Sequence, residues 1–178
     1  METVYLEGFH GVGKSMLGKV LASRKNLAYL DIDSAIVEKE NRDIKTIVQE
    51  SGVEYYRNLE KYILKNSITQ GMIVSTGAGI VLDEENRHLI KKSGRVVYLR
   101  AKASTIYSNI ENYHNDIAIF SNNFTVLQVE KYLDMYKSYY EELQNYAIDV
   151  DDKSIEELIP EVIAIYNFIN KPKAHIYI

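Results

Sequence analysis

A lysine and a serine near the amino terminus stand at the spacing used to bind nucleotide phosphates. Residues 8–15 read Gly-Phe-His-Gly-Val-Gly-Lys-Ser, the phosphate-loop pattern of a glycine, four residues and then Gly-Lys-Ser. Glycines let such a loop turn its backbone N–H groups toward one point, Lys14 adds a positive charge for the outer phosphates, and Ser15 offers a hydroxyl to Mg²⁺. A glycine-rich turn without a ligand is the alternative. The candidate nucleotide-contacting residues are Gly8, Gly11, Val12, Gly13, Lys14, Ser15 and Met16.

The segments on either side of this loop are predicted to be a strand and a helix, as the phosphate-loop pattern requires. Residues 3–7 are short and β-prone, and residues 15–24 place Leu17, Val20 and Leu21 on one helical face. A helix that begins directly after the loop points its N–H groups and positive dipole end at the bound phosphates. The order of strand, loop and helix therefore predicts a nucleoside triphosphate site.

Two aspartates follow the next predicted strand. Residues 27–31 are apolar and end in Asp31, and Asp33 comes two residues later. In open α/β sheets, ligands bind at the carboxyl ends of the strands, where a second glycine-rich turn, Gly77-Ala78-Gly79, is also expected. A helix cap is the structural alternative for this pair. Because the three clusters should meet at one edge, we interpret the aspartates as functional, with Asp33 suited to orient a nucleophile in phosphoryl transfer.

Strand and helix patterns alternate through the rest of the chain. Such alternation predicts a three-layer, doubly wound α/β fold with a five-stranded parallel sheet, in one domain over residues 1–178. Substrate-binding helices are expected at about 33–62, and a mobile lid at about 101–127, where the pattern is weak. The predicted strands are 3–7, 27–31, 72–75, 95–99 and 146–150, and the predicted helices are 15–24, 34–40, 43–50, 53–68, 83–92, 129–144 and 154–170.

The composition favours small molecules as ligands. A net charge of −4 argues against a nucleic-acid or polybasic membrane surface, because such surfaces need clustered cations. No apolar run reaches the roughly 18 residues of a membrane span, and no cleavable leader is recognised, so we expect a cytoplasmic monomer. The absence of cysteine excludes disulfides, thiolate metal sites and a thiol nucleophile.

Taken together, the motifs resemble the shikimate kinase family of small phosphate-loop kinases, whose fold is like that of the nucleoside-monophosphate kinases. The resemblance rests on residues 8–15, Asp31-Ile32-Asp33, Tyr56-Arg57 with Glu60, and Gly77-Ala78-Gly79, in the family's order and spacing. It implies ATP and Mg²⁺ as cofactors, and shikimate as the acceptor whose 3-hydroxyl receives the γ-phosphoryl group. Such a reaction belongs to aromatic amino acid biosynthesis.

The resemblance also implies a role for individual residues. Asp31 helps hold Mg²⁺ through water beside Ser15, and Asp33 holds the substrate hydroxyl and takes its proton beside the catalytic Lys14. Arg57 grips the substrate carboxylate, although a surface charge paired with Glu60 or Glu54 is the alternative for it. The residues whose backbone packs against the substrate ring are Gly77, Ala78 and Gly79. Ala78 replaces the family's middle glycine, which requires a negative φ at that position.

The second half of the chain departs from the family. No arginine follows Arg100, whereas the family places one arginine in its lid, near Asn115 here, and another near Tyr136. Losing a carboxylate-binding arginine weakens binding by about 1.5–3 kcal/mol, and a transition-state arginine is worth about 10³–10⁵ in rate in nucleotide hydrolases. The lysines that could substitute, unless they are solvated helix charges, are Lys102, Lys131 and Lys137.

Three functions remain open at this point. The chain is a shikimate kinase, a kinase of another small polyol or cyclitol that needs no carboxylate clamp, or a nucleotide-binding protein with little activity that acts through a partner. A panel of acceptors separates the first two, and ADP binding without turnover on any acceptor favours the third. One further residue stands out: Glu7 ends the first strand, where an apolar residue is usual, and we predict that it pairs with Lys14 or Arg57.

Overall fold

A parallel β-sheet of five strands forms the centre of the computed structural model, which describes residues 1–112 and 124–171. The strands lie in the order β2-β3-β1-β4-β5, and each neighbouring pair is parallel. Their bounds are β1 Thr3–Glu7, β2 Tyr29–Asp31, β3 Ile73–Ser75, β4 Gly94–Arg100 and β5 Tyr146–Asp149. The predicted five-stranded parallel sheet is confirmed.

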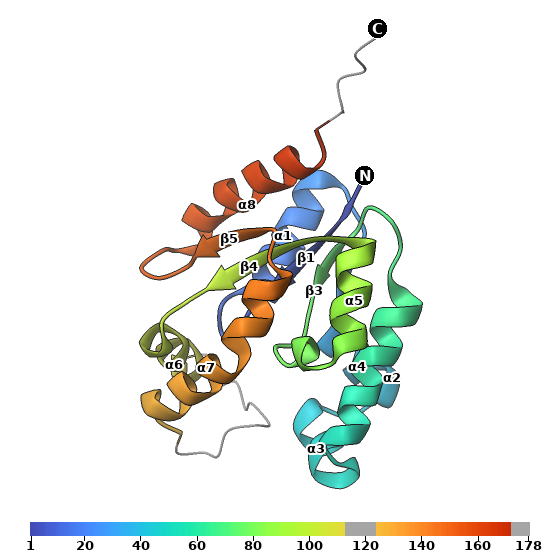
Figure 1. Cartoon of the computed structure of the whole chain (residues 1–178), viewed down its shortest axis with the longest axis vertical. Helices are drawn as coiled ribbons and strands as arrows, with labels where there is room; N and C mark the ends of the chain where they lie inside the picture. The colour runs from blue at the N-terminus through green and yellow to red at the C-terminus, as the bar shows by residue number, and fades with distance from the viewer. Residues whose placement is uncertain (113–123, 172–178) are drawn as a thin grey trace, which may run out of the picture.

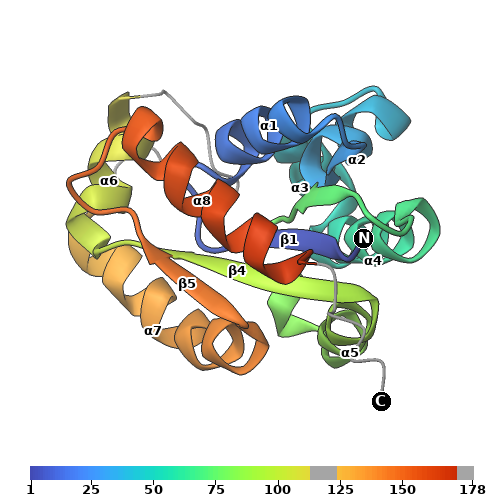
Figure 2. The ribbon, with the colours of Figure 1, turned by 90° about the horizontal axis from the view of Figure 1, so that it is seen from above.

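Helices cover both faces of this sheet. The helices are α1 Lys14–Lys25, α2 Ile32–Glu40, α3 Ile44–Ser51, α4 Val53–Ser67, α5 Glu84–Ser93, α6 Ala103–Asn112, α7 Val126–Leu143 and α8 Ile155–Ile169, with a 3₁₀ turn, η1, at Ile80–Leu82. Helices α1 and α8 lie on one face, α5 and α7 lie on the other, and α2, α3 and α4 stand beside the sheet edge (Figures 1 and 2). The three-layer, doubly wound fold is therefore confirmed.

The central strand β1 fixes where a ligand can bind. All five of its residues are buried, and it pairs with β3 on one side and β4 on the other. From β1 the chain goes first to the edge strand β2, returns to β3 beside β1, and then crosses to β4 and β5 on the other side, so the order of the strands changes direction at β1. Ligands of open α/β sheets bind at such a switch point, outside the carboxyl ends of the strands. The phosphate loop leaves β1 at that end.

Side-chain caps set where several helices begin. The carboxylates of Asp31, Asp43 and Asp83 accept backbone N–H groups of the first turns of α2, α3 and α5. Ser154 and Glu157 form a full capping box on α8, as its sequence predicts. The cap at Asp31 starts α2 at Ile32, two residues before the predicted start. Asp33 thus lies in the first helical turn and not on the end of the strand.

The segment predicted as a lid is partly a regular helix. Helix α6 occupies residues 103–112 and buries Ile106 and Ile110, so the weak pattern concealed an amphipathic helix. The last two residues of the prediction, Val126 and Leu127, already belong to α7, whereas its residues 113–123 lie outside the described residues. The position near Asn115 proposed for the family's lid arginine falls there.

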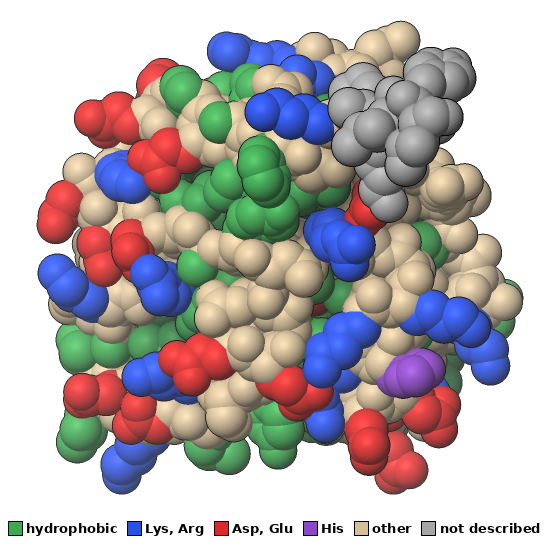
Figure 3. All heavy atoms as spheres, turned by 45° about the horizontal axis from the view of Figure 1, so that its top comes forward, with side chains coloured by type: hydrophobic (Ala, Val, Ile, Leu, Met, Phe, Trp, Pro, Cys, Tyr) green, Lys and Arg blue, Asp and Glu red, His purple; other side chains and the backbone are tan. Residues whose placement is uncertain are grey.

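The molecular surface carries charges of both signs. On the face shown in Figure 3, acidic and basic side chains are interspersed and form no continuous basic field. Within the described part of the chain, no helix combines the length and the apolarity needed to cross a membrane.

Candidate active site

The phosphate loop has the backbone conformation that its glycines permit. Gly8, Gly11 and Gly13 have φ angles of 144°, 76° and 91°, which residues with a side chain rarely adopt. Lys14 opens α1 and is 8% exposed, and its ammonium donates to the carbonyl oxygens of Gly8 at 2.8 Å and Phe9 at 2.7 Å. Burial lowers the pKa of Lys14, against the opposing effect of nearby carboxylates. The loop therefore holds the Lys14 ammonium through two of its own backbone carbonyl oxygens.

Helix α6 supports the loop from outside. The Asn109 amide donates to the carbonyl oxygen of Gly11 at 2.8 Å, and a β-carbon at Gly11 would lie 3.3 Å from Ile110. Val12 is buried, whereas Met16 is 46% exposed. The contact of Asn109 was not foreseen, because the surrounding sequence gives a weak helical signal.

Oxygen atoms from three elements gather at the start of α1. The Tyr29 hydroxyl lies 3.1 Å from the Ser15 carbonyl oxygen, from Asp31 Oδ2 and from Ser75 Oγ. In the described ranges, no three His, Asp or Glu side chains group closely enough to bind a metal unaided. Mg²⁺ in kinases is held by one or two protein oxygens together with substrate phosphates, and the hydroxyl of Ser15 with the carboxylate of Asp31 fits that donor set.

Asp33 lies opposite the second glycine-rich turn. The Tyr56 hydroxyl donates to Asp33 Oδ1 at 2.7 Å, and a β-carbon at Gly77 would lie 3.0 Å from the same oxygen. Burial raises the pKa of Asp33, while the Tyr56 hydrogen bond lowers it. The electrostatic neighbours of this carboxylate include Lys14 and Arg57. Asp33 is thus placed between the phosphate loop and the turn, as the sequence predicted.

Arg57 and Glu60 form an ion pair on the adjoining face of α4. Arg57 Nη1 donates to Glu60 Oε2, and Glu60 is fully buried. Of the alternative given for Arg57, a surface charge paired with Glu60 or Glu54, the partner Glu60 is correct, but Glu60 is buried while Arg57 is 27% exposed. A β-carbon at Gly79 would lie far inside contact distance of the Arg57 guanidinium. Burial raises the pKa of Glu60 to about 7, although Arg57 opposes the rise.

The middle residue of the turn is compatible with alanine. Ala78 is not among the described residues with positive φ, which meets the condition set by its sequence. Its side chain is buried, and its carbonyl oxygen accepts from the Tyr140 hydroxyl of α7 at 2.7 Å. The turn is therefore anchored from behind by α7, while Gly77 and Gly79 face the site.

Glu7 is buried, but the predicted ion pair is wrong. Its Oε2 accepts from the Thr76 hydroxyl at 2.7 Å, and its Oε1 has no hydrogen-bond partner among the described residues. Lys14 is occupied by loop carbonyls and Arg57 by Glu60. Burial raises the pKa of Glu7 to about 8, against the effects of Thr76 and Lys14, so the carboxyl is largely neutral at physiological pH.

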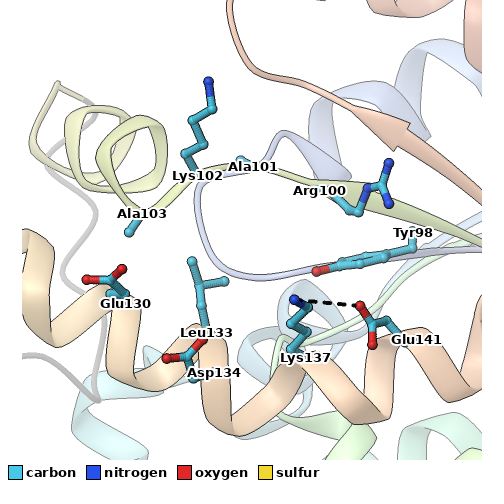
Figure 4. A pocket seen from close by; sticks show the side chains of 10 residues that line it. All are labelled: Tyr98, Arg100, Ala101, Lys102, Ala103, Glu130, Leu133, Asp134, Lys137 and Glu141. Carbon is cyan, nitrogen blue, oxygen red and sulfur yellow. Dashed lines mark ion pairs between the residues drawn. The ribbon is translucent and has the colours of Figure 1, made fainter.

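The lysines proposed as substitutes for arginine lie at the surface. Lys102, Lys131 and Lys137 are exposed, and none is among the electrostatic neighbours of Asp33. Lys137 is 65% exposed and points toward Glu141 of its own helix, 4.0 Å away (Figure 4). Lys102 and Lys137 line a shallow pocket of about 430 Å³ between α7 and the end of β4. In the described structure Lys131 and Lys137 are solvated charges on α7, and Lys102 is a solvated charge just before α6.

Tyr136 lies on α7, at the position near which the family's second arginine was expected. It is 5% exposed, and its ring centroid lies 5.6 Å from that of Phe9 in the phosphate loop. Arg57 is an electrostatic neighbour of its hydroxyl. An aromatic residue, and not a cation, therefore faces Arg57 from α7.

The structure brings together most of the residues that the sequence singled out. The phosphate loop, the aspartate pair, Arg57 and the glycine turn converge at one edge of the sheet, as predicted. The supporting residues that sequence reasoning missed are Tyr29, Asn109 and Tyr140. Their contacts join residues far apart in the chain, so no local pattern could have indicated them.

Comparison with known proteins gives a consistent result. The sequence model of the family described as "Shikimate kinase" matches residues 10–167. A shikimate kinase of Sulfurihydrogenibium sp. (strain YO3AOP1) is 34% identical over 164 residues, covering 92% of this chain and 96% of the relative. One from Enterococcus faecalis (strain ATCC 700802 / V583) is 33% identical over 166 residues, covering 92% and 97%.

Solved structures agree on the fold. Shikimate kinase from Acinetobacter baumannii in complex with shikimate aligns with a TM-score of 0.88 at 24% identity, over 97% of this chain and 96% of that one. A gluconokinase from Sinorhizobium meliloti 1021 aligns less closely, with a TM-score of 0.64 at 17% identity, over 94% and 93%. From its sequence matches over nearly the whole length, the chain belongs to the shikimate kinase family.

Proposed function

We propose that this protein transfers the γ-phosphoryl group of ATP to the 3-hydroxyl of shikimate. Membership of the family supports ATP as donor and shikimate as acceptor. The observation that carries the proposal is the convergence of Asp33, Arg57 and Gly79 beside the phosphate loop. It provides a base, a carboxylate-binding cation and a backbone surface for a ring within one site.

Each residue of the site has a separate role in the proposed reaction. Lys14 and the N–H groups at the start of α1 bind the phosphates, and Arg57 binds the acceptor carboxylate. Asp33 Oδ2 accepts the proton of the acceptor hydroxyl, whose oxygen bonds to the γ-phosphorus. The bond between that phosphorus and the β–γ bridging oxygen breaks, and its electron pair leaves with ADP. Phosphoryl transfer depends mainly on such positioning and charge neutralisation.

Ser15 and Asp31 are the residues that we assign to Mg²⁺. The ion neutralises charge on the phosphates when it is bound with ATP. Tyr29 supports this assignment, because its hydroxyl lies 3.1 Å from both Asp31 Oδ2 and the Ser15 backbone carbonyl oxygen and so joins the Asp31 carboxylate to the start of α1.

The assignment of larger segments rests on the same site. We assign acceptor binding to α2, α3 and α4, in keeping with the predicted range of 33–62. A lid at about 101–127 stays a prediction, as do the cytoplasmic location and the monomeric state.

A polyol or cyclitol acceptor is the rival that one observation favours, because Tyr136 and not an arginine faces Arg57. An acceptor panel tests this directly. Shikimate, its reduced-carboxylate analogue and neutral cyclitols are compared by kcat/KM for ADP release. The proposal expects shikimate to be preferred, and equal use of the reduced analogue would favour the rival.

A further inference from the structure

We propose that Tyr56 is a positioning residue for the catalytic base: its hydroxyl holds one oxygen of Asp33 so that the other is presented to the acceptor hydroxyl. This inference rests on the proposed function, in which Asp33 takes the proton. Neither the family match nor the resemblance in sequence assigns this role to the phenol.

The hydrogen bond joins two helices of the acceptor site. Tyr56 lies on α4 and Asp33 in the first turn of α2, and the hydroxyl oxygen is 2.7 Å from Oδ1. A β-carbon at Gly77 would lie 3.0 Å from the same Oδ1 and 3.3 Å from the Tyr56 hydroxyl. Oδ1 is therefore enclosed by the phenol and the turn. Oδ2 is the oxygen left for an acceptor.

The phenol itself is held firmly. Tyr56 is 6% exposed, and its ring belongs to the hydrophobic core. The guanidinium carbon of Arg57, the next residue in the chain, lies 5.0 Å from the centroid of the Tyr56 ring. Because packing fixes the ring, the hydroxyl keeps its place when the base exchanges its other contacts. Tyr56 thus orients the base, and the adjacent residue, Arg57, is the proposed carboxylate-binding cation.

The phenol is a neutral hydrogen-bond donor at every working pH, because burial raises the pKa of Tyr56 far above its usual range. It therefore orients Asp33 Oδ1 without adding a charge to the site.

Removing the hydroxyl alone tests this inference. Tyr56→Phe keeps the ring, and Tyr55→Phe is the matched control, since the Tyr55 hydroxyl donates to Glu40 at 3.0 Å on the outer side of the same helix. Initial rates of shikimate-dependent ADP release give kcat and the KM for shikimate in each protein, and Tm reports stability. The ¹³C shift of the Asp33 side-chain carboxyl, assigned with Asp33→Asn, is recorded in each protein at one neutral pH.

In Tyr56→Phe we expect kcat to fall about tenfold, with the KM for shikimate and ADP binding unchanged, because a general base must lie within hydrogen-bond reach of the proton that it takes. The Asp33 carboxyl carbon should shift, since Oδ1 has lost its donor. Tyr55→Phe should match the wild type in both measurements.

Two results would overturn the inference. One is a kcat and an Asp33 carbon shift that are the same in wild type and Tyr56→Phe. The other is a rise in the KM for shikimate as large as the loss in kcat, together with a lower Tm, which marks a bond that only joins α2 to α4. If the wild type releases no ADP with shikimate, the proposed function fails, whereas the carbon shift still decides whether the phenol holds Asp33.

Discussion

The Arg57 guanidinium lies directly against Gly79, in the space that a β-carbon at that position would fill. Glu60, fully buried on the next turn of α4, holds Nη1 of the same guanidinium. The Arg57 guanidinium therefore has the backbone of Gly79 on one side and the Glu60 carboxylate on another. This arrangement sets where an acceptor carboxylate can be bound.

Gly79→Ala should weaken acceptor binding selectively. The φ of Gly79 is −92°, which alanine adopts without strain, so the effect comes from displacing Arg57 and not from the backbone. We expect KM for shikimate to rise about tenfold or more, while the KM for ATP is unchanged. Initial-rate kinetics with each substrate varied in turn measure both. An unaltered shikimate KM would mean that Arg57 does not bind the acceptor.

Replacing Arg57 by lysine should show whether its forked shape matters. Lysine keeps the charge but loses the paired N–H groups that match a carboxylate, so KM for shikimate should rise roughly 10- to 100-fold. The increase in Tm caused by ADP serves as the control and should persist. Retention of wild-type KM in Arg57→Lys would favour an acceptor without a carboxylate.

The effect of replacing a lysine by alanine should depend on where that lysine lies. Lys14→Ala should abolish turnover and the stabilisation by ADP, because Lys14 is the buried cation of the phosphate loop. Single alanine substitutions at Lys102, Lys131 and Lys137 should each change kcat less than about twofold, since these side chains are solvated. A large loss at any of the three would show that it takes the place of a missing arginine.

Glu7 should make stability depend on pH. Its pKa is raised by burial to about 8 from an ordinary value of 4.5, so its neutral form is favoured in the folded protein. The stability it contributes is present below about pH 4.5 and is lost as pH rises to about 8. Glu7→Gln should remove this loss, and above pH 8 it should unfold at higher denaturant, by on the order of 1–3 kcal/mol.

The matched control for that measurement is Glu54→Gln, on the exposed start of α4. Denaturant unfolding of both variants and the wild type at pH 5, 7 and 9 gives the comparison. A gain for Glu7→Gln that is the same at all three values would show that Glu7 does not titrate in this range.

The sequence was sufficient for the sheet and the main motifs because both depend on local signals. The apolar strand segments, the phosphate loop and the Ser154 capping box each depend on a few neighbouring residues. Their convergence then follows from the geometry of parallel strands. Helix α6 was missed, since its polar and aromatic residues blur the apolar pair Ile106 and Ile110.

What could not be read from the sequence are the partners of single polar groups. Glu7 was expected to meet a cation, but Thr76 of the neighbouring strand end reaches it instead. Tyr56 was named only as the neighbour of Arg57 in a motif, and only the packing of α4 against α2 reveals its bond to Asp33. Such contacts depend on distances across the fold, which spacing along the chain does not encode.

Shikimate-dependent ADP release is the measurement that tests the central claim most directly. The wild type and Asp33→Asn are assayed with ATP, with and without shikimate, and ADP binding is followed by the change in Tm. We expect wild-type ADP release to require shikimate and to yield one phosphate ester by ³¹P NMR. Asp33→Asn should still be stabilised by ADP but release none. A wild type that binds ADP yet shows no shikimate-dependent release would contradict the account.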